Sequence, residues 1–371
     1  MLTLAIDASR ANREKRTGVE NYAWEIIEEL KKQLPNNIQV ILYSQEKLKG
    51  QLAILPENWS SKVLSWPPKK FWTQIRLSLE MILHRPDILF IPAHVFPLIH
   101  PKKTVMTVHD VAALNFPETY NRFERWYTIW SVKKALKKMW KIITPSIFTK
   151  KEILRLTKKK EKVEKKIFVI PHGYRKKENL ILDLDIKNEI GLKGDYLLSI
   201  GRLEEKKNSK RIIEAFDLLK QTGLFPDLFL VLIGKKGFGF EKVFLAIQKS
   251  NFKNQIILTD WLCDEKAFAL LETAKIFVFP SLYEGFGLPV LEAFEYEVPV
   301  LTSVNGGSLS EIGGTACLYV DGLNSEDISK KLKEILDSES LREEMKKQGK
   351  EELKKYSWEK AGQETIKILL S

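Results

Sequence analysis

Short apolar runs alternate with amphipathic segments over the first 170 residues of the chain. The apolar runs predict buried strands, and the helical spacing of apolar residues across 20–32 predicts a helix between the first two strands. Such alternation is typical of a parallel sheet covered by helices. The predicted strands are Leu2–Ile6, Ile38–Tyr43, Ile88–Ile91 and Thr104–Val108.

The alternation restarts after a charged stretch at 176–193, which predicts a second doubly wound domain. Its predicted strands are 196–200, 228–233, 256–258 and 276–279, and its predicted helices are 210–220, 241–248 and 265–273. The chain has 371 residues, of which 44% are hydrophobic, and this is enough for two cores of ordinary size. We therefore predict an α/β protein of two Rossmann-like domains facing a cleft, with domains at 1–175 and 176–355.

Candidate binding residues follow several of the predicted strands. In open parallel sheets, ligands bind beyond the carboxyl ends of the strands, where the connecting loops gather. The loops that follow predicted strands contain Gly18, His109, Arg202, Gly234 and Glu284. The sequence thus predicts a ligand site among these loops.

The run 280–294 carries the most chemical information. Gly285 and Gly287 permit a tight turn with outward-facing N–H groups at the start of a helix, where partial positive charge suits a phosphate or a sugar oxygen. Glu292, about two turns inside that helix, can accept hydrogen bonds from a polyol such as a ribose. A capped helix in an ordinary α/β unit is the alternative interpretation.

Glu284 and Glu292, with Gly-Phe-Gly-Leu-Pro between them, resemble the paired glutamates of retaining glycosyltransferases of family 4. The stretch Gly201-Arg202-Leu203, followed by Lys207, resembles the glycine-arginine-leucine stretch and lysine of that family. Four more segments agree with it in order: Thr17-Gly18-Val19, Val108-His109-Asp110, Ile170-Pro171-His172-Gly173 and Tyr356-Ser357-Trp358. The resemblance covers nearly the whole chain. It implies a GT-B fold, with an acceptor-side first domain against which a closing helix at 356–371 packs.

The resemblance also implies a role for each matching residue. Arg202 and Lys207 would bind the donor diphosphate, Glu284 the sugar hydroxyls and Glu292 the ribose. The implied contacts with sugar and phosphate further include the backbone of Phe286, Gly287 and Leu288, the side chain of His109, and the backbone of Gly18. The chain departs from the family at Thr17, where a second glycine is usual. The implied reaction is a same-face substitution in which the leaving phosphate helps to deprotonate the acceptor hydroxyl.

Breaking the bond to a nucleoside diphosphate requires that negative charge on the leaving group be neutralised. Arg202, with its planar donor fork, and Lys207, with its point charge, can do this as fixed cations, although both can also be ordinary surface residues of a lysine-rich protein. No Asp-x-Asp pair follows a predicted strand, because Asp183 and Asp185 lie in the charged stretch. We therefore expect transfer without a metal or a cofactor, with the nucleotide sugar as substrate.

The net charge of +12 is concentrated in one segment, since 131–166 holds 14 lysines and arginines against 3 acidic residues. Helical spacing predicts that Lys134, Lys137, Lys138 and Lys141 share one face beside aromatic residues, which would suit an anionic membrane surface. A solvated lysine face behind a core-facing aromatic stripe is the alternative. A nucleic-acid surface ranks lower because no nucleic-acid-binding module accompanies the charge.

The two cysteines, Cys263 and Cys317, lie in apolar contexts without metal spacing, which predicts reduced core residues of a cytosolic protein. No apolar run approaches the length that crosses a bilayer. We therefore expect a cytoplasmic protein that associates peripherally with the cytoplasmic face of the membrane.

The leading functional hypothesis is a retaining, metal-independent hexosyltransferase of cell-envelope glycan synthesis. It would move mannose from GDP-mannose to a lipid-linked or polysaccharide acceptor, and the choice of mannose rests on overall likeness to mannosyltransferases. One alternative is a soluble transferase that makes a glucan or a small glycoside from UDP- or ADP-glucose. Another is a basic nucleic-acid-binding protein, which would have no need for Arg202, Lys207, Glu284 and Glu292 together.

Overall fold

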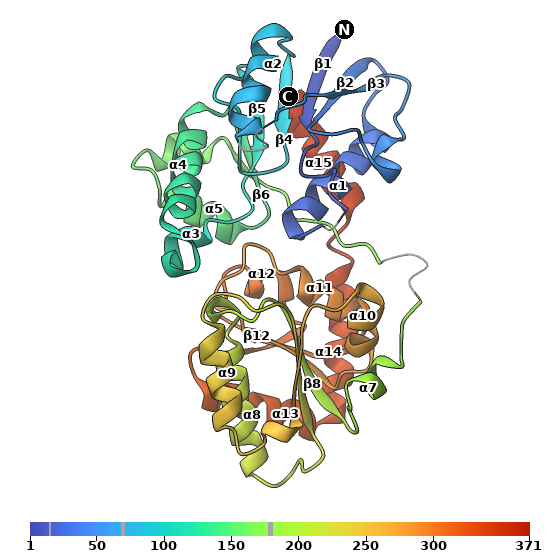
Figure 1. Cartoon of the computed structure of the whole chain (residues 1–371), viewed down its shortest axis with the longest axis vertical. Helices are drawn as coiled ribbons and strands as arrows, with labels where there is room; N and C mark the ends of the chain where they lie inside the picture. The colour runs from blue at the N-terminus through green and yellow to red at the C-terminus, as the bar shows by residue number, and fades with distance from the viewer. Residues whose placement is uncertain (15, 68–70, 177–180) are drawn as a thin grey trace. The chain divides into compact units, whose positions relative to one another are not determined.

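The computed structural model describes all residues of the chain except 15, 68–70 and 177–180. The chain divides into two compact units. Unit 1 is Met1–Gly173 with Tyr356–Ser371, and unit 2 is Tyr174–Lys355. Each unit contains one sheet of parallel strands flanked by helices (Figure 1). The prediction of two Rossmann-like domains is therefore confirmed.

The sheet of unit 1 has seven strands in the order β3-β2-β1-β4-β5-β6-β7. Leu4 and Ile6 of β1 belong to one hydrophobic cluster and Ala5 to another, because successive strand residues point to opposite faces. Both faces are thus buried, as a sheet of parallel strands requires. The strands are β1 (Leu2–Asp7), β2 (Ile38–Ser44), β3 (Trp59–Val63), β4 (Ile88–Ile91), β5 (Lys103–Thr107), β6 (Lys141–Thr144) and β7 (Ile167–Val169).

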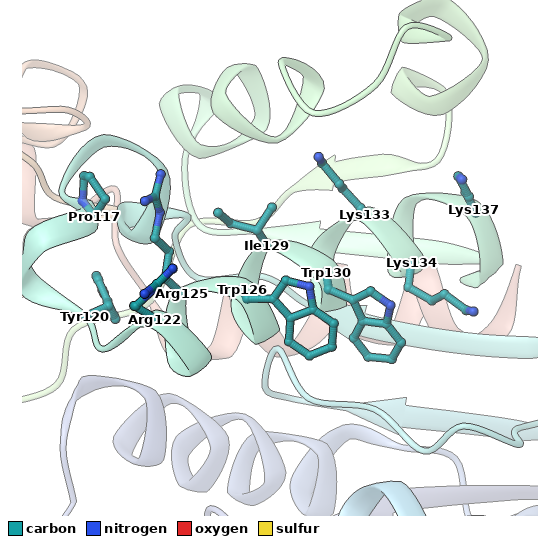
Figure 2. Close-up of a pocket in the computed structure, with 10 residues that line it drawn as sticks. All are labelled: Pro117, Tyr120, Arg122, Arg125, Trp126, Ile129, Trp130, Lys133, Lys134 and Lys137. Atoms are coloured by element: carbon teal, nitrogen blue, oxygen red, sulfur yellow. The ribbon is translucent and has the colours of Figure 1, made fainter.

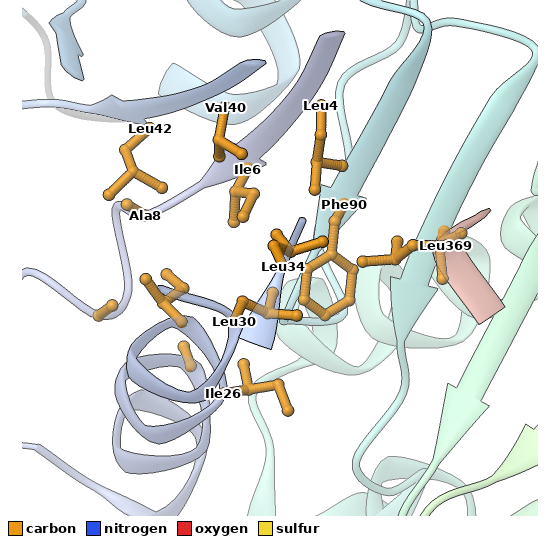
Figure 3. Packing of buried hydrophobic residues seen from close by; sticks show 14 of the residues in the cluster. Leu4, Ile6, Ala8, Ile26, Leu30, Leu34, Val40, Leu42, Phe90 and Leu369 are labelled. Atoms are coloured by element: carbon orange, nitrogen blue, oxygen red, sulfur yellow. The ribbon is translucent and has the colours of Figure 1, made fainter. Parts of the chain in front are cut away.

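Helix α1 (Gly18–Gln33) covers one face of this sheet (Figure 3). Ile26 and Leu30 of α1 are fully buried against Leu4 and Val40 of the strands. The C-terminal helix α15 (Trp358–Leu370) packs on α1 and contributes Leu369 to the same cluster. The other helical segments are η1 (Gly50–Ala53), η2 (Trp72–Arg76), α2 (Leu77–Leu83), α3 (Ala112–Asn115), η3 (Pro117–Thr119), α4 (Arg122–Lys138), α5 (Ile147–Leu154) and α6 (Lys160–Glu164).

The sheet of unit 2 has six parallel strands in the order β10-β9-β8-β11-β12-β13. The strands are β8 (Tyr196–Ile200), β9 (Phe229–Ile233), β10 (Ile256–Thr259), β11 (Ile276–Phe279), β12 (Val300–Ser303) and β13 (Cys317–Val320). The helical segments are α7 (Ile186–Glu189), η4 (Glu205–Lys207), α8 (Ser209–Gln221), α9 (Phe240–Lys249), η5 (Lys253–Gln255), α10 (Asp264–Glu272), α11 (Leu288–Glu295), α12 (Leu309–Gly313), α13 (Ser325–Asp337) and α14 (Glu339–Leu353). The strand order changes direction between β8 and β11, and in open sheets ligands bind beside such a point.

Two predictions about local structure need correction. Helix α4 ends at Lys138, because Met139 turns to an extended backbone and its side chain is buried in the core, so Lys141 lies on strand β6 and not on the helix. Cys317 is buried as predicted, whereas Cys263 is the N-cap residue of α10 and is only partly buried. Among the described residues, none of the helices is both long and apolar enough to span a membrane.

Candidate active site

The loop that follows β11 carries Glu284, and it is held in place by the loop that follows β12. The backbone N–H of Glu284 donates to Gly306 O at 3.0 Å, and that of Ser308 donates to Glu284 O at 3.1 Å. The Ser308 hydroxyl adds hydrogen bonds to Glu284 O and, at 2.6 Å, to Phe286 O. These contacts fix the backbone of the loop in one conformation before any ligand binds.

Gly287 is the N-cap residue of α11 and has a φ of 113°, in the region that favours glycine. A Cβ atom at this position would also lie 2.9 Å from Leu309 Cδ2. Leu288 is therefore the first residue of α11, and the buried Phe286 lies just before the glycine. Pro289 has no N–H group and the N–H of Val290 donates to Gly287 O at 3.0 Å, so the N–H of Leu288 is the group at this helix start that suits an anion.

Lys207 and Glu284 meet in an ion pair, with Lys207 Nζ 2.5 Å from Glu284 Oε1. The same carboxylate oxygen accepts a hydrogen bond of 2.6 Å from the Ser281 hydroxyl. Both charged side chains are mostly buried, with 18% and 13% of their surface exposed. The structure thus brings together two residues that are far apart in the sequence and that the resemblance assigns to the donor.

Asn208 connects the loop after β8 to the loop after β11. Its backbone is left-handed, with a φ of 64°, and the side-chain amide donates to Pro280 O at 3.0 Å and to Gly322 O at 2.6 Å. Asn208 is also the N-cap residue of α8 and is 2% exposed. The sequence pattern does not predict this positioning residue, because its side chain makes no capping hydrogen bond to α8 and binds carbonyl groups of distant loops.

Arg202 lies near this ion pair in the sequence but does not contact Glu284. Its side chain is 68% exposed, and its Nε atom is 4.0 Å from Glu204 Oε2. Arg202 follows Gly201 in the loop after β8. A Cβ atom at Gly234, in the loop after β9, would lie only 1.9 Å from the carbonyl oxygen of Gly201. The two loops therefore approach each other so closely that only glycine fits at position 234. The exposed guanidinium is therefore available to a ligand from this pair of loops.

Glu292 lies in the second turn of α11, close to the start of unit 2. Burial raises the pKa of Tyr174, and the negative charges of Glu292 and Glu295 raise it further. The Tyr174 hydroxyl is therefore protonated at neutral pH. The structure places Glu284 before α11 and Glu292 within it, as the motif predicts, and Leu288 and Gly287 lie between them.

His109 follows β5 in unit 1, and its imidazole is buried. Nε2 lies 3.2 Å from Pro92 O, and the ring packs edge-on against Tyr22 with 4.7 Å between the ring centroids. Burial lowers the pKa of His109 to about 4, so the ring is neutral at physiological pH. Nε2 is then the protonated donor, and the buried Nδ1 atom has no hydrogen-bond partner among the described residues.

Gly18 is the first residue of α1, two residues earlier than the predicted helix start. The preceding residue, Thr17, caps the helix, and its backbone N–H donates to Glu20 Oε2 at 3.0 Å. Apart from its chain neighbours and the backbone of its own helix, no described atom lies within 4 Å of the position that a Cβ atom would take at Gly18. The N-terminus of α1 is therefore open for the close approach of a ligand, although Gly18 and His109 belong to a different unit from Lys207 and Glu284.

The predicted basic face is only partly formed. Lys134, Lys137 and Lys138 lie on α4, but Lys141 Nζ donates to Ile368 O at 3.0 Å and to Ser371, so its ammonium group anchors the C-terminal helix. The prediction that Lys141 belongs to this face is wrong. The described residues include no group of three or more histidines, cysteines or acids that could hold a metal ion.

Two family models match the chain, one in each half. The model described as Glycosyltransferase Family 4 matches residues 16–177, and the model described as Glycosyl transferases group 1 matches residues 181–352. Together they span most of the sequence, and the boundary between them falls within a few residues of the boundary between the two units.

Curated proteins and solved structures resemble the chain over different lengths. The O-antigen chain mannosyltransferase B of Escherichia coli is 29% identical over 304 residues, which is 81% of this chain and 76% of that protein. An N-acetylgalactosaminyltransferase of Campylobacter jejuni, named for a diphospho-undecaprenol substrate, is 26% identical over 53% of this chain and 54% of its own length. The sucrose-phosphate synthase structure from Thermosynechococcus elongatus has a TM-score of 0.73 at 16% identity and covers 99% of this chain and 98% of its own, which shows the shared GT-B fold alone.

We predict that His109 makes the stability of the protein depend on pH. Its pKa is about 4 in the folded state against about 6.5 in an unfolded chain. Below pH 6.5 the unfolded chain therefore binds a proton that the folded chain does not, and the free energy of unfolding decreases as the pH falls from 6.5 to 4. The full effect is about 3 kcal/mol.

Urea unfolding at pH 7, 5.5 and 4.5 measures this dependence. Replacement of His109 by Gln keeps a donor for Pro92 O and removes the titrating group, so the variant should lose less stability between pH 7 and 4.5 than the parent does. An equal loss in parent and variant would show that His109 does not titrate as described.

Proposed function

Because this chain belongs to glycosyltransferase family 4, we propose that it transfers a hexose from a nucleotide sugar with retention of configuration and without a metal. The observation that carries the proposal is the contact between Lys207 and Glu284. It joins an ammonium group, which would bind a diphosphate, to a carboxylate, which would accept hydrogen bonds from sugar hydroxyls, at the switch point of a parallel sheet. A donor whose sugar and phosphate are adjacent fits this pair.

The donor would be bound by three kinds of group. The ammonium of Lys207 and the exposed guanidinium of Arg202 would bind the diphosphate, together with the backbone N–H groups of Gly287 and Leu288. Glu284 would accept hydrogen bonds from the sugar hydroxyls, and Glu292 from the ribose. In the free protein, Glu284 holds the ammonium group of Lys207 close to where the phosphate would lie, so little reorganisation is needed when the donor binds.

The transfer step exchanges one bond of the anomeric carbon for another. The bond to the phosphate oxygen breaks, and the acceptor hydroxyl forms the new bond on the same face of the sugar. Its proton passes to the leaving phosphate oxygen, so the products are the glycoside and the nucleoside diphosphate. Lys207 and Arg202 would stabilise the negative charge that develops on the leaving group, as a divalent cation does in other enzymes.

We propose mannose from GDP-mannose as the donor and a lipid-linked or polysaccharide acceptor. The support is the similarity to a mannosyltransferase of O-antigen chains across most of both sequences. Transfer of glucose from UDP- or ADP-glucose to a small glycoside is the alternative. A panel of nucleotide sugars tested for turnover separates the two donors.

We also propose that unit 1 contacts the cytoplasmic surface of an anionic membrane. The predicted lysines support this in part, and a row of exposed aliphatic side chains adds to it. Ile75 of η2 and Leu79 and Ile82 of α2 follow helical spacing, and they are 42%, 46% and 55% exposed. Such a row on a helix surface is unusual for a face that meets only water.

The aliphatic row lies beside the basic helix α4. The side chain of Gln74 in η2 is hydrogen-bonded to the Tyr127 hydroxyl of α4, which joins the two elements. On the other side, the backbone N–H of the exposed Ile99 donates to the Ser78 hydroxyl at 3.2 Å, so the loop at 98–99 extends the apolar surface. Aliphatic side chains flanked by cations match the acyl chains and phosphates of an anionic bilayer.

We predict that Lys207→Ala and Arg202→Ala each weaken binding of a nucleoside diphosphate by about tenfold or more. Each change removes a charge-assisted contact of about 1.5–3 kcal/mol. Titration calorimetry with GDP and with guanosine, both in excess EDTA, measures the effect, and guanosine binding should change little. Lys210→Ala is the matched control, since Lys210 lies on α8 close by, pairs with Glu214 and should leave both affinities unchanged. Equal losses for guanosine and GDP, or GDP binding that requires Mg²⁺, would contradict the proposed phosphate contacts.

We predict that replacing Leu79 and Ile82 together by Asn releases the protein from anionic vesicles. Both side chains are exposed, so the fold should tolerate the change, while each loses roughly 1 kcal/mol of burial in lipid, which together lowers the partition coefficient about tenfold or more. Flotation with phosphatidylglycerol vesicles measures this. Leu245→Asn on α9 of unit 2 is the control, because Leu245 is 55% exposed as well. A double variant that floats like the parent would show that this surface does not meet lipid.

A further inference from the structure

A groove of about 670 Å³ runs along helix α4, within unit 1 (Figure 2). Its walls come from α4 and from the segment around η3 that precedes the helix. The chain reaches this groove directly from β5 and His109 through α3. None of the residues assigned above to the nucleotide sugar lines it.

The residues that line the groove carry positive charge and no negative charge. Arg122, Arg125, Lys133, Lys134 and Lys137 all line it, and none of its lining residues is acidic. None of these five cations forms an ion pair with a residue that the structure describes. Some lysines elsewhere are paired, such as Lys346 on α14, which contacts Glu343 at 2.6 Å. Unpaired cations around a concave surface favour an anionic ligand.

Two tryptophans give the groove an aromatic edge. The rings of Trp126 and Trp130 stack with 6.0 Å between their centroids and 19° between their planes, and Trp126 is 57% exposed. Figure 2 shows the two rings side by side along one edge of α4, with Lys133 and Lys137 on the other. Behind them, the buried Phe96 stacks on Trp130 at 6.5 Å and 8°. The indole edge is thus supported from the core and is not a freely moving surface side chain.

We propose that this groove binds the acceptor, as a saccharide whose reducing end carries a lipid-linked diphosphate. The C–H face of a pyranose would pack on the indole of Trp126, while Arg122 and Arg125 would bind the phosphates through their planar donor forks. The inference rests on the proposed glycosyl transfer, because it assigns the groove to the second substrate of that reaction. A phosphate-free polysaccharide acceptor would leave the five cations without a partner.

The proposed reaction decides between this ligand and a single-stranded nucleic acid, which also stacks on aromatic side chains in basic grooves. The cations that line the groove extend along α4 from Arg122 to Lys137, and Phe123 and Tyr127 continue the aromatic row beside the tryptophans. Glycosyl transfer needs an acceptor as its second substrate, and a sugar diphosphate offers an anion to these cations and a ring face to Trp126. Nucleic-acid binding is therefore the outcome that the experiment must be able to detect.

The test compares two soluble acceptors that differ only in the diphosphate: mannose joined through a diphosphate to citronellol, and citronellyl mannoside. Arg122→Gln with Arg125→Gln should raise KM for the diphosphate acceptor at least tenfold, with kcat within threefold of the parent value, and should leave KM for the mannoside unchanged. Trp126→Ala should raise KM for both acceptors several-fold, since both carry the sugar. All three side chains are exposed, so the fold should persist.

The control is Lys158→Gln with Lys159→Gln, which removes two exposed charges outside the groove and should leave both KM values unchanged. Titration calorimetry with the diphosphate compound alone reports binding without turnover.

Binding that depends on the two arginines, with no transfer from any nucleotide sugar, would refute the proposed function and leave the groove assignment standing. The groove assignment is overturned if the double arginine variant affects both acceptors equally or neither. It is also overturned if a dT oligonucleotide binds in a Trp126-dependent manner and the diphosphate compound does not displace it.

Discussion

The ion pair between Lys207 and Glu284 joins the two loops on which the proposed donor site depends. It connects the end of β8 to the end of β11, and these strands are neighbours at the switch point of the second sheet. Two mostly buried charges are stable only when they are paired and hydrogen-bonded, and the Ser281 hydroxyl supplies the additional hydrogen bond. The pair therefore fixes both loops, and it sets a cation and an anion side by side, as our proposal for a sugar phosphate requires.

The neighbouring backbone supports this pair from three directions. Asn208 ties the β8 loop to Pro280 O and Gly322 O, the Ser308 hydroxyl holds the β11 loop, and Gly287 turns the chain into α11. Hydrogen bonds between these loops hold most of the proposed site, and α11 contributes Leu288 and Glu292. We interpret this as preorganisation for a charged ligand, which lowers the cost of binding. Arg202, in contrast, is exposed and lies outside this set of hydrogen-bonded side chains.

Much of the fold was predictable because parallel strands buried on both faces leave a clear apolar signal. The run before Glu284 and the two glycines after it also predicted the turn into α11. Features set by distant contacts were not predictable in this way. Helical spacing extended the lysine face to Lys141, whereas the chain leaves the helix to bury Met139 and to bind the C-terminus through Lys141. The tie made by Asn208 depends on Gly322, more than a hundred residues away, and no local pattern indicates it.

Retention of configuration during metal-free transfer is the central chemical claim, and the product reports on it directly. GDP-mannose carries an α-linked sugar, so same-face substitution must give an α-mannoside. The product formed from GDP-mannose and citronellyl diphosphate-linked mannose in excess EDTA contains one newly transferred mannose. NMR of this product should show the transferred mannose only as the α-anomer. A β-mannoside, or turnover that appears only when Mg²⁺ or Mn²⁺ is restored, would contradict the proposed mechanism.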